Sequence, residues 1–389
     1  MPTDDQQVHH GLEGIAVAET RLSDIDGEAG ELTIGGFRLD ELAGNATYEE
    51  SVFLLWNDRL PTAEELAVFR DDLAARRDIG SEVREVLRRA AEEDKPAMDA
   101  LRMGAAAANL GSRDEGGEDD EVDDGDPEED ARRVVAAFPT IVATYWRYRQ
   151  GEKPVAPRED LGHAANYLYM LNGEEPTDAA VRGLETYLNT VVDHGLNAST
   201  FTARVVVSTE SDVVSAATAA VGTLKGPLHG GAPGPVLDML TEVHEHGDPE
   251  AYVHETLDAG ERLMGFGHRV YRVRDPRAAV LSSAAERFYE ASGDTDFFET
   301  VTAFEDVAVE VLAEHKPDRR LETNVEFYTA ALLHGVGVPR DLFTATFGVS
   351  RVGGWTAHCL EQLEDNRLVR PRSRYVGDAE RTWTPVEQR

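Results

Sequence analysis

Apolar residues recur every three to four positions over most of the chain, which is the spacing of amphipathic α-helices. Two such segments, Thr62-Ala-Glu-Glu and Ser81-Glu-Val-Arg-Glu, begin with a hydroxyl followed by acids, as helix N-termini do. The pattern predicts helices over Ala46–Trp56, Thr62–Arg77, Ser81–Glu93, Ala131–Arg149, Asp178–Val192, Ser211–Leu224, Pro249–Met264, Pro276–Ser292 and Asn324–Gly335. We therefore expect a mainly α-helical protein.

Strand-like patterns are confined to the beginning of the chain. Ile15–Thr20 and Glu31–Phe37 are short segments with β-branched or aromatic residues, and the turn-rich stretch Asp24–Gly30 separates them. Segments of this kind predict a small hairpin or two edge strands beside the helices.

One stretch differs from its surroundings because acidic residues fill it. Between Asp114 and Asp130, twelve of seventeen residues are Asp or Glu, interrupted by glycines and Pro127. Like charges at this density repel one another, so we expect a disordered, solvated surface loop between helices. A calcium site is the functional alternative, but the stretch lacks the ligand pattern of an EF-hand.

Composition bounds the fold class and the environment. A chain of 389 residues with 41% hydrophobic residues can form a globular interior and is long enough for two domains. The net charge is −36, with 74 acidic against 38 basic residues, and the only lysines are Lys95, Lys153, Lys225 and Lys316. Such self-repulsion destabilises a compact fold unless salt screens it. This favours a halophilic protein over an acidic mesophilic one.

The sequence disfavours several other classes of protein. No basic face is evident, so nucleic acid is not expected as a partner. The chain has neither a charged-then-apolar leader nor an apolar run approaching about 18 residues, so we expect a cytoplasmic protein outside the membrane. The single cysteine, Cys359, excludes an internal disulfide and a Cys-based metal site. Its helical stretch, Trp355–Leu363, indicates a buried structural thiol.

Positive charge is concentrated around G-F-G-H-R-V-Y-R-V-R-D-P-R at Gly265–Arg277. Between Arg262 and Arg277, five arginines and His268 face a single acid, Asp275. The five are Arg262, Arg269, Arg272, Arg274 and Arg277. Arginine forks match carboxylate and phosphate groups, so the window predicts a site for an anionic small molecule. Internal ion pairs with nearby acids are the structural alternative.

A second arginine cluster follows towards the C-terminus. Its members are Arg351, Arg367, Arg370, Arg372 and Arg374. Pro371 and the lack of helical patterning predict that the last four lie on a loop. Two separate clusters suit a substrate with more than one carboxylate, or two different anions.

Three histidines lie in glycine-bounded loops. His194 belongs to D-H-G-L-N-A-S-T, at a predicted loop-to-helix junction where Asn197 is a good cap. His229 belongs to G-P-L-H-G-G at Gly226–Gly231, and His268 lies inside the first arginine cluster. A single such histidine is usually structural. Three in this setting favour acid/base catalysis, because the pKa of histidine lies near the working pH.

Metal and dinucleotide sites are disfavoured. His244-Glu245-His246 with His254 lacks the H-E-x-x-H spacing that places two imidazoles on one helical face, so a surface helix is preferred. Gly265-Phe266-Gly267 follows a predicted helix rather than a strand, unlike a dinucleotide-binding fingerprint.

Six motifs follow one another along the chain: D-H-G-L-N-A-S-T, G-P-L-H-G-G, G-F-G-H-R-V-Y with D-P-R, N-V-E-F-Y, V-S-R-V-G-G-W and R-P-R-S. Their order and approximate spacing resemble those of the citrate synthase family. G-L-E-G-I-A-V near the start and L-Y-M-L-N-G at Leu168–Gly173 extend the likeness over nearly the whole chain outside the acidic stretch. The sequence is similar to the shorter bacterial and archaeal type, and its acidic composition resembles haloarchaeal members.

The resemblance implies a domain organisation. It implies a mainly α, two-domain helical fold in which a smaller, mobile domain closes over a large one, with a minor N-terminal β-hairpin. The large domain would comprise residues 1–231 and 332–389, with the acidic loop at about 114–130, and the small domain residues 232–331. The resemblance also implies a homodimer.

The resemblance further implies the chemistry. Acetyl-CoA condenses with oxaloacetate and water to citrate and CoA, in an acyltransferase of the tricarboxylic acid cycle that needs neither metal nor cofactor. By the family's pattern, His229 stabilises the enol of acetyl-CoA and His268 polarises the oxaloacetate carbonyl. Closure of the small domain would exclude water until condensation is complete.

The resemblance also assigns binding residues. The oxaloacetate carboxylates would be held by His194, Arg277, Arg351 and Arg370, the last reaching in from the partner subunit. The CoA-contacting segment would be Arg262, Leu263, Met264, Gly265 and Phe266. Arg319 or Lys316 would contact the CoA phosphates.

One position departs from the family's pattern, and it is the general base. The family has N-V-D, whereas this chain has Asn324-Val325-Glu326. Glu326 keeps a carboxylate but moves its oxygens by about 1–1.5 Å unless the backbone or rotamer compensates. A misplacement of roughly 1 Å can lower a rate on the order of 100-fold. Either the helix carrying Glu326 is shifted, or catalysis is impaired or redirected.

Three functions follow from these observations. The leading hypothesis is an active citrate synthase working as a homodimer. A 2-methylcitrate synthase using propionyl-CoA is the nearest alternative, because one methylene changes binding by only about 1–3 kcal/mol. A non-catalytic relative that binds CoA or dicarboxylates as a sensor or structural partner is motivated by Glu326 alone.

Overall fold

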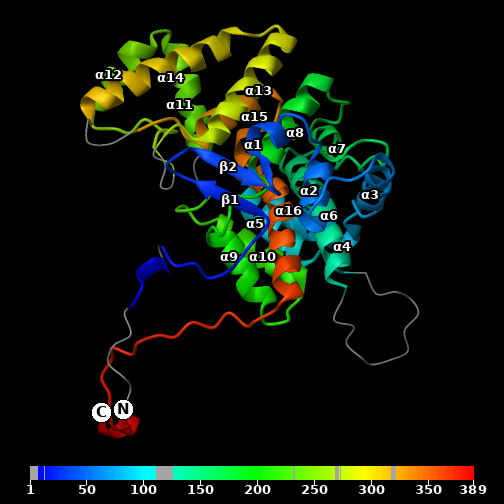
Figure 1. The fold of residues 1–389 in the computed structure, drawn as a ribbon, viewed down its shortest axis with the longest axis vertical. Coiled ribbons are helices and arrows are strands. Elements are labelled where there is room, and N and C mark those ends of the chain that lie inside the picture. The colour runs from blue at the N-terminus through cyan, green and yellow to red at the C-terminus, as the bar shows by residue number, and fades with distance from the viewer. Residues whose placement is uncertain are drawn as a thin grey trace.

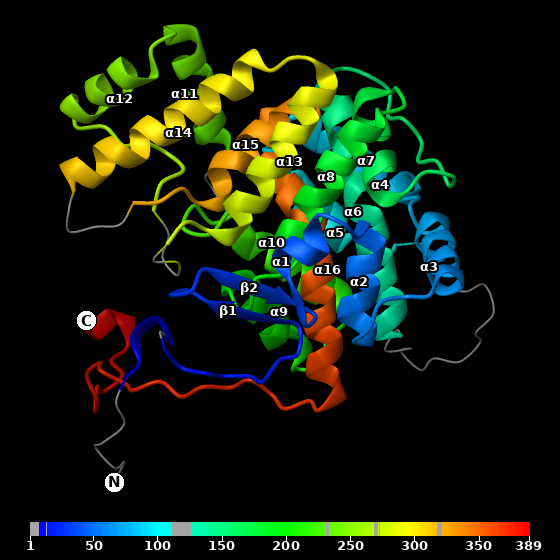
Figure 2. The same cartoon turned by 45° about the horizontal axis from the view of Figure 1, so that its top comes forward.

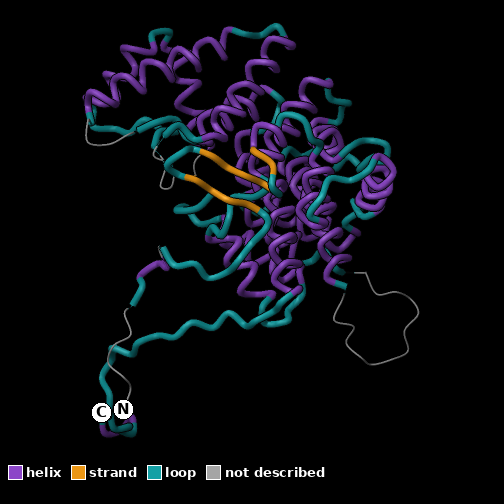
Figure 3. Tube along the Cα trace, in the orientation of Figure 1, coloured by secondary structure: helices purple, strands orange, loops and turns teal. Residues whose placement is uncertain are grey.

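The computed structural model of the chain describes residues 8–12, 14–110, 126–230, 233–267, 271, 273–316 and 321–389. Helices make up most of these residues, as the sequence pattern predicts, and the strands lie near the N-terminus (Figure 3). Among the described helices, none is both long and apolar enough to cross a membrane.

The helices predicted from the apolar spacing are all present, with small shifts at most ends. In the first half of the chain the helices are α1 (Leu39–Ala43), α2 (Tyr48–Asn57), α3 (Ala63–Ala75), α4 (Gly80–Glu92), α5 (Ala97–Ala106), α6 (Pro127–Arg149), α7 (His163–Asn172) and α8 (Asp178–Val191). In the second half they are α9 (Ala198–Val207), α10 (Val213–Leu224), α11 (Pro233–His246), α12 (Pro249–Asp258), α13 (Pro276–Ser292), α14 (Asp296–His315), α15 (Val325–Gly335) and α16 (Phe343–Glu364). Short 3-10 turns lie at His10–Leu12, Arg340–Leu342 and Val386–Gln388.

Local sequence sets one of the two predicted helix starts. The Thr62 hydroxyl accepts the Glu65 backbone N–H, and the Glu65 carboxylate accepts the Thr62 backbone N–H, which is a reciprocal capping box. The other prediction is wrong in detail. Helix α4 begins at Gly80, one residue before Ser81, and no side chain caps it.

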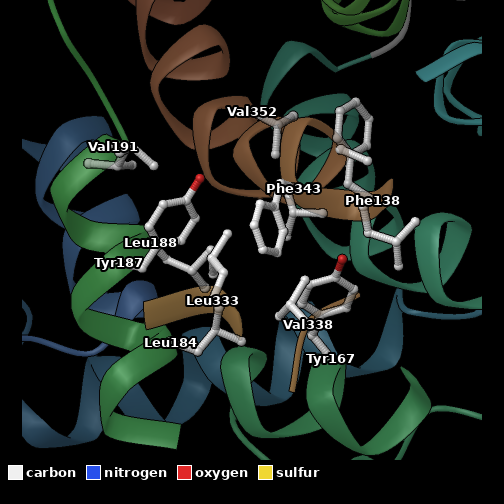
Figure 4. Close-up of a cluster of buried hydrophobic side chains, with 14 of the residues drawn as sticks. Phe138, Tyr167, Leu184, Tyr187, Leu188, Val191, Leu333, Val338, Phe343 and Val352 are labelled. Atoms are coloured by element: carbon white, nitrogen blue, oxygen red, sulfur yellow. The ribbon is translucent and has the colours of Figure 1, made fainter. Parts of the chain in front are cut away.

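Helix α16 runs through the middle of the larger group of helices and packs against α2, α6, α8, α9 and α10 (Figure 1). The neighbouring core joins side chains of α6, α7, α8, α15 and α16, including Phe138, Tyr167, Leu184, Leu333 and Val352 (Figure 4). Burial of each large apolar side chain contributes about 1.5–3 kcal/mol to folding.

Several helices were not predicted from periodicity, among them α7 and most of α16. Both are buried on nearly every side, so neither shows the polar stripe of a surface helix. Helix α11 opens with Pro-Gly-Pro, which is typical of a loop. Helices α1, α5, α9 and α14 are also additional to the predicted set.

A second group of helices stands apart from the first. Helices α11, α12 and α14 pack on one another, and α13 and α15 connect them to α8 (Figures 1 and 2). The helices thus form a larger group around α16 and a smaller group beyond α13 and α15.

The strands form one antiparallel sheet in the order β1 (Ser23–Asp26), β2 (Glu31–Ile34), β3 (Phe37–Arg38). The hairpin prediction is confirmed for β2, but the prediction for Ile15–Thr20 is wrong. That segment is exposed and pairs with no strand among the described residues. Strand β1 starts at Ser23 and overlaps the stretch predicted as a turn, because acidic residues flanking Ile25 hide its alternation.

Helix α12 ends earlier than predicted. The prediction Pro249–Met264 is wrong beyond Asp258, because Gly260 follows with a φ of 77°. Glycine favours this left-handed conformation, which terminates helices. Residues 261–267 therefore form a loop.

The acidic stretch is described only at its end. Residues 111–125 lie outside the described residues, so the disordered loop stays a prediction there. The prediction is wrong for Pro127–Asp130, which form the first turn of α6. Asp126 caps this helix by accepting the Glu128 N–H, and proline and acids in the first turn suit a helix N-terminus.

Both ends of the chain leave the helical body on the same side (Figures 1 and 2). Residues 14–22 and 366–389 are mostly extended, and Glu361 anchors the first of them by accepting the Arg21 backbone N–H at 2.9 Å. We call them the terminal arms. Their exposed apolar side chains are Ile15, Val17, Leu368, Tyr375, Val376, Trp383 and Val386.

Candidate active site

His229 lies in a tight loop between α10 and α11, as predicted. The loop needs glycine at position 230, because a Cβ there would stand 2.3 Å from the Leu224 carbonyl oxygen. The His229 backbone N–H donates to the Gly226 carbonyl at 2.9 Å. The Thr344 hydroxyl donates to the Gly230 carbonyl, also at 2.9 Å. These contacts fix the loop against the end of α10 on one side and the start of α16 on the other.

The His229 imidazole is held from behind by Ser199, near the start of α9. Its Nε2 lies 3.3 Å from the Ser199 backbone N–H and 2.8 Å from the Ser199 hydroxyl oxygen. Trp355 Nε1–H donates to the same hydroxyl oxygen at 3.0 Å. Since a backbone N–H can only donate, Nε2 accepts and the ring proton lies on Nδ1. Burial, with a contribution from Arg351, lowers the pKa of His229 to about 4, so the ring is neutral at neutral pH.

Glu326 is the second residue of α15. Asn324 caps the helix by accepting the Glu326 backbone N–H at 3.0 Å. Asn324 is itself fixed, since its backbone N–H donates to the Gly265 carbonyl at 2.9 Å and its side chain donates to the Gly267 carbonyl at 3.0 Å. Burial raises the pKa of Glu326 to about 7, although Arg277 acts in the opposite direction. The carboxylate is therefore an unusually strong base for its type.

His229 and Glu326 line the same cavity, together with Pro233, Thr329 and Phe347. Its volume is about 30 Å³, room for on the order of two water molecules. A neutral imidazole and a carboxylate of raised pKa thus face one small space, which is an acid/base pair in a confined site.

The loop between α12 and α13 requires its glycines. Gly265 and Gly267 have φ values of 87° and 84°, and a Cβ on Gly265 would lie 3.0 Å from the Phe327 ring. Phe266 forms an isolated antiparallel β-bridge with Thr323, so the loop runs alongside the segment that leads into α15. The segment predicted to contact CoA, Arg262–Phe266, lies in this loop. Within it Leu263 and Gly265 are buried and Arg262 is exposed.

Arg277 is the second residue of α13 and is buried. Its guanidinium pairs with the buried Asp275 carboxylate at 2.8 Å, and Asp275 also caps the helix by accepting the Arg277 N–H. The Tyr271 ring lies 5.8 Å from the Arg277 guanidinium, and its hydroxyl lies 3.1 Å from His194 Nε2. Tyr271 therefore joins the two predicted substrate residues. Sequence reasoning missed it, although it stands in the G-F-G-H-R-V-Y motif.

His194 lies in the turn between α8 and α9, and Asn197 caps α9 as predicted. The junction predicted for His194 is thus confirmed.

Arg351 is buried in α16. Its Nε donates to the Val191 carbonyl at 2.6 Å and its guanidinium lies 4.5 Å from the Phe347 ring, but Nη2 has no hydrogen-bond partner among the described residues. Burial lowers its pKa to about 10, and Arg277 adds to this while Asp193 opposes it. Two buried, mutually repelling guanidiniums, one with an unpaired nitrogen, suit an anion.

Other predicted site residues are not brought together. His268, Arg269, Arg272 and Arg319 lie outside the described residues. The loop predicted for Arg367, Arg370, Arg372 and Arg374 is confirmed, and all four are exposed on the C-terminal arm. The grouping of Arg351 with them is wrong, because Arg351 is buried in helix α16. Lys316 caps the end of α14 and is exposed.

The ion-pair alternative holds for two residues of the first arginine cluster. Arg274 pairs with Glu305 at 2.9 Å, and Arg277 pairs with Asp275. His244 and His246 lie on the exposed end of α11, so the surface-helix interpretation is confirmed. No group of three potential metal ligands occurs among the described residues.

Comparison with known proteins gives consistent matches over nearly the whole chain. Residues 11–372 match the family model "Citrate synthase, C-terminal domain". The chain is 47% identical to a citrate synthase of Haloferax volcanii, covering 98% of this chain and 99% of that protein. It is 41% identical to citrate synthase 2 of Bacillus subtilis, covering 97% and 98%.

A solved structure matches as well. The ternary complex of carboxymethyl coenzyme A and oxaloacetate with citrate synthase from Thermoplasma acidophilum has a TM-score of 0.84 at 29% identity, covering 98% of this chain and all of that one. The fold and these matches define an acyltransferase. The chain belongs to the citrate synthase family, as its motifs predict.

Proposed function

We propose that this protein condenses acetyl-CoA with oxaloacetate and water to give citrate and CoA. One observation carries the proposal: neutral His229 and the high-pKa carboxylate of Glu326 line one small cavity. Enolisation of a thioester needs a base at the methyl group and a hydrogen-bond donor at the carbonyl oxygen. The identity with the Haloferax citrate synthase supports the same reaction.

In the first step Glu326 takes a proton from the acetyl methyl group. A pKa of about 7 makes this carboxylate a stronger base than an exposed glutamate, while a large part of it is still ionised at neutral pH. His229 donates its Nδ1–H to the thioester oxygen and stabilises the enol. The neutral ring is suited to this because Ser199 fixes its orientation and tautomer.

In the second step the enol carbon attacks the ketone carbon of oxaloacetate. Arg277 and Arg351, with His194, are proposed to bind the carboxylates and hold the ketone in register. His268 is proposed from the family pattern to give the ketone oxygen its proton. Hydrolysis of the thioester then releases CoA and citrate. Acetyl-CoA is a co-substrate, proposed to contact Arg262–Phe266, and no further cofactor is proposed.

The two proposed domains meet at this site. Residues 232–331, with α11 to α14, would form the small domain that carries Glu326 and Arg277. Residues 1–231 and 332–389 would form the large domain that carries His229, His194 and Arg351. Closure would bring the base onto the methyl group and exclude water during condensation.

The proposal is tested by measuring CoA release in molar potassium chloride with oxaloacetate and either acetyl-CoA or propionyl-CoA. We expect acetyl-CoA to give a kcat/KM about 10- to 100-fold higher, because the cavity has little room for another methylene. Absence of CoA release by the folded protein with either donor would overturn the proposal. Preference for propionyl-CoA would instead identify a 2-methylcitrate synthase.

The rate should fall as the pH drops below neutral. A general base works only when ionised, and the pKa of Glu326 is about 7. We therefore expect kcat/KM to decrease about tenfold per pH unit well below that value. Rates measured across this range at constant salt check the prediction, and a profile flat down to about pH 5 would exclude Glu326 as the base.

Replacement of Ser199 by alanine should impair the His229 contact without removing the imidazole. The variant loses the hydroxyl that lies 2.8 Å from Nε2 and leaves Trp355 Nε1–H unpaired. We expect kcat to fall about 10- to 100-fold with little change in the KM for oxaloacetate. Thr202→Ala is the matched control, because this hydroxyl on α9 contacts Ala198 and Thr223 instead.

We further propose that the protein is a homodimer in which each C-terminal arm covers its partner. The exposed apolar side chains of the arms support this, as does Arg370, which is exposed on the arm whereas Arg351 is buried in α16. Light scattering should give twice the chain mass, and truncation after Asp365 should give the single mass and raise the KM for oxaloacetate. A single mass for the full chain would contradict the dimer.

The net charge of −36 supports a halophilic, cytoplasmic protein. Salt at molar concentration shortens the screening length to about 3 Å and removes most of the repulsion between surface carboxylates. Urea unfolding should therefore show higher stability in molar potassium chloride than in dilute buffer, and equal stability would contradict halophily.

A further inference from the structure

Three buried side chains that the proposed mechanism does not use form a chain of contacts behind the site. They are Arg204 on α9, His358 on α16 and Asp193, which immediately precedes His194, and each is at most 5% exposed. Arg204 Nη1 lies 3.0 Å from His358 Nδ1, and His358 Nε2 lies 3.2 Å from Asp193 Oδ1. The contacts link α9 and α16 to the turn that carries His194.

The contact between Arg204 and His358 determines which atom carries the proton in the contact between His358 and Asp193. A guanidinium only donates, so His358 Nδ1 accepts from Arg204 and the ring proton lies on Nε2, facing Asp193. The Nε2 to Oδ1 contact is not a straight hydrogen bond, but neither atom has another partner among the described residues. Arg204 is itself held, because its Nε donates to Gln362 at 3.0 Å and its Nη1 to Glu361 at 2.6 Å.

The other oxygen of Asp193 holds the turn. Oδ2 accepts the Ser23 hydroxyl of β1 and lies 3.3 Å from the Gly195 backbone N–H. The same N–H donates to Ser23 Oγ at 2.8 Å. Asp193 and Ser23 therefore fix the backbone directly after His194, whose Nε2 faces Tyr271.

Helix α16 is pressed against this turn. A Cβ at Gly354 would stand 2.2 Å from the Val192 carbonyl oxygen and 2.9 Å from Asp193 Oδ1. Arg351, Gly354 and His358 are spaced three and four residues apart, so they lie on one face of the helix. The face that fixes Asp193 is therefore the face that presents the proposed substrate residue Arg351.

We propose that His358, held in one tautomer by Arg204, is a positioning residue for oxaloacetate binding that acts through Asp193. It does not touch substrate. It holds His194 in register with Arg351, so that both meet the same dicarboxylate. The inference rests on the proposed function, since it concerns the oxaloacetate half of that site.

The test compares His358→Leu with His358→Gln. Leucine removes both polar atoms, whereas the glutamine amide can accept from Arg204 through oxygen and donate to Asp193 through nitrogen. Thr356→Val is the matched control, because Thr356 is equally buried on α16 but bonds to Trp56. Kinetic constants for both substrates and calorimetric binding of oxaloacetate are measured in molar potassium chloride.

We expect His358→Leu to raise the KM and Kd for oxaloacetate about 10- to 100-fold, with the KM for acetyl-CoA and the saturating kcat changed less than about threefold. His358→Gln should restore most of the affinity, and Thr356→Val should leave it at the wild-type value. Should His358→Leu not fold, Ser23→Ala takes its place, with a smaller rise in the same KM.

The outcomes separate the two proposals. Wild-type protein that binds no oxaloacetate and releases no CoA overturns the proposed function and this inference with it. If the wild-type enzyme is active and the KM of His358→Leu for oxaloacetate stays within about twofold of the wild-type value, only this inference is overturned. The same holds if His358→Gln matches His358→Leu, or if Thr356→Val raises the KM equally.

Discussion

Replacement of Glu326 by glutamine is expected to lower kcat by about 1000-fold or more, because general-base catalysis contributes typically 100- to 10,000-fold and an amide cannot take a proton. The KM for oxaloacetate should change little, since the proposed carboxylate ligands are elsewhere. Glu326→Asp should retain more activity than the amide, but less than wild type if α15 is adapted to the longer side chain.

Glu326→Gln should also raise the folding stability of the protein above neutral pH. The folded-state pKa of Glu326, about 7, lies above its ordinary value of 4.5. Below the ordinary value the group is protonated in both states. As the pH rises towards 7 the unfolded chain releases the proton first, so folding stability falls, and above 7 the full penalty is present.

The glutamine variant removes this penalty, which is on the order of 1–3 kcal/mol. Urea unfolding at about pH 5 and about pH 8 should show a stability gain at the higher pH that shrinks at the lower one. Glu322→Gln, three positions before the start of α15 at Val325, is the control and should change neither rate nor stability appreciably. A glutamine variant with wild-type kcat would remove Glu326 from the mechanism.

Replacement of Gly354 by alanine is expected to be strongly destabilising. Its methyl group would stand 2.2 Å from the Val192 carbonyl oxygen, which is backbone and cannot rotate away. Helix α16 must then move away from the turn that precedes α9 to relieve the clash. Overpacking of this kind costs about 3 kcal/mol or more, and the oxaloacetate KM should rise because Arg351 is on the same helix.

Gly222→Ala provides the comparison for that variant. Gly222 lies inside helix α10, and its added methyl group would have only the Arg102 side chain within 4 Å, at 3.8 Å. Alanine favours a helix over glycine by about 1 kcal/mol, so stability should stay equal or increase. Urea unfolding of both variants at constant potassium chloride checks the pair, and equal destabilisation would show that the Gly354 contact is not responsible.

The fold could be predicted best where local sequence sets both ends of an element. Helix α13 begins and ends where the periodicity predicts, because Asp275 caps its start and Gly293 follows its end with a φ of 77°. Helix α16 lacks such signals and is buried all round, so only its second half was evident. Strand β1 depends on pairing with β2, which no local pattern of S-D-I-D could indicate.

The residues of the candidate site also differ in how far the sequence could predict them. His194, His229 and Arg277 stand in motifs whose residue types already indicate chemistry. Tyr271 acquires its place only when the loop before α13 meets the turn after α8. The contact between His358 and Asp193 joins segments far apart in the chain, so tertiary packing alone creates it.

The buried cysteine of α16, predicted from its helical stretch, has a practical consequence. Cys359 is 1% exposed, and burial raises the pKa of its thiol to about 12, so almost no thiolate forms. A thiol-reactive chromogenic disulfide added to the assay would therefore titrate liberated coenzyme and leave the folded protein unlabelled. Equally, a cysteine introduced at exposed Val376 would be the one reactive position, where a fluorophore could follow the C-terminal arm.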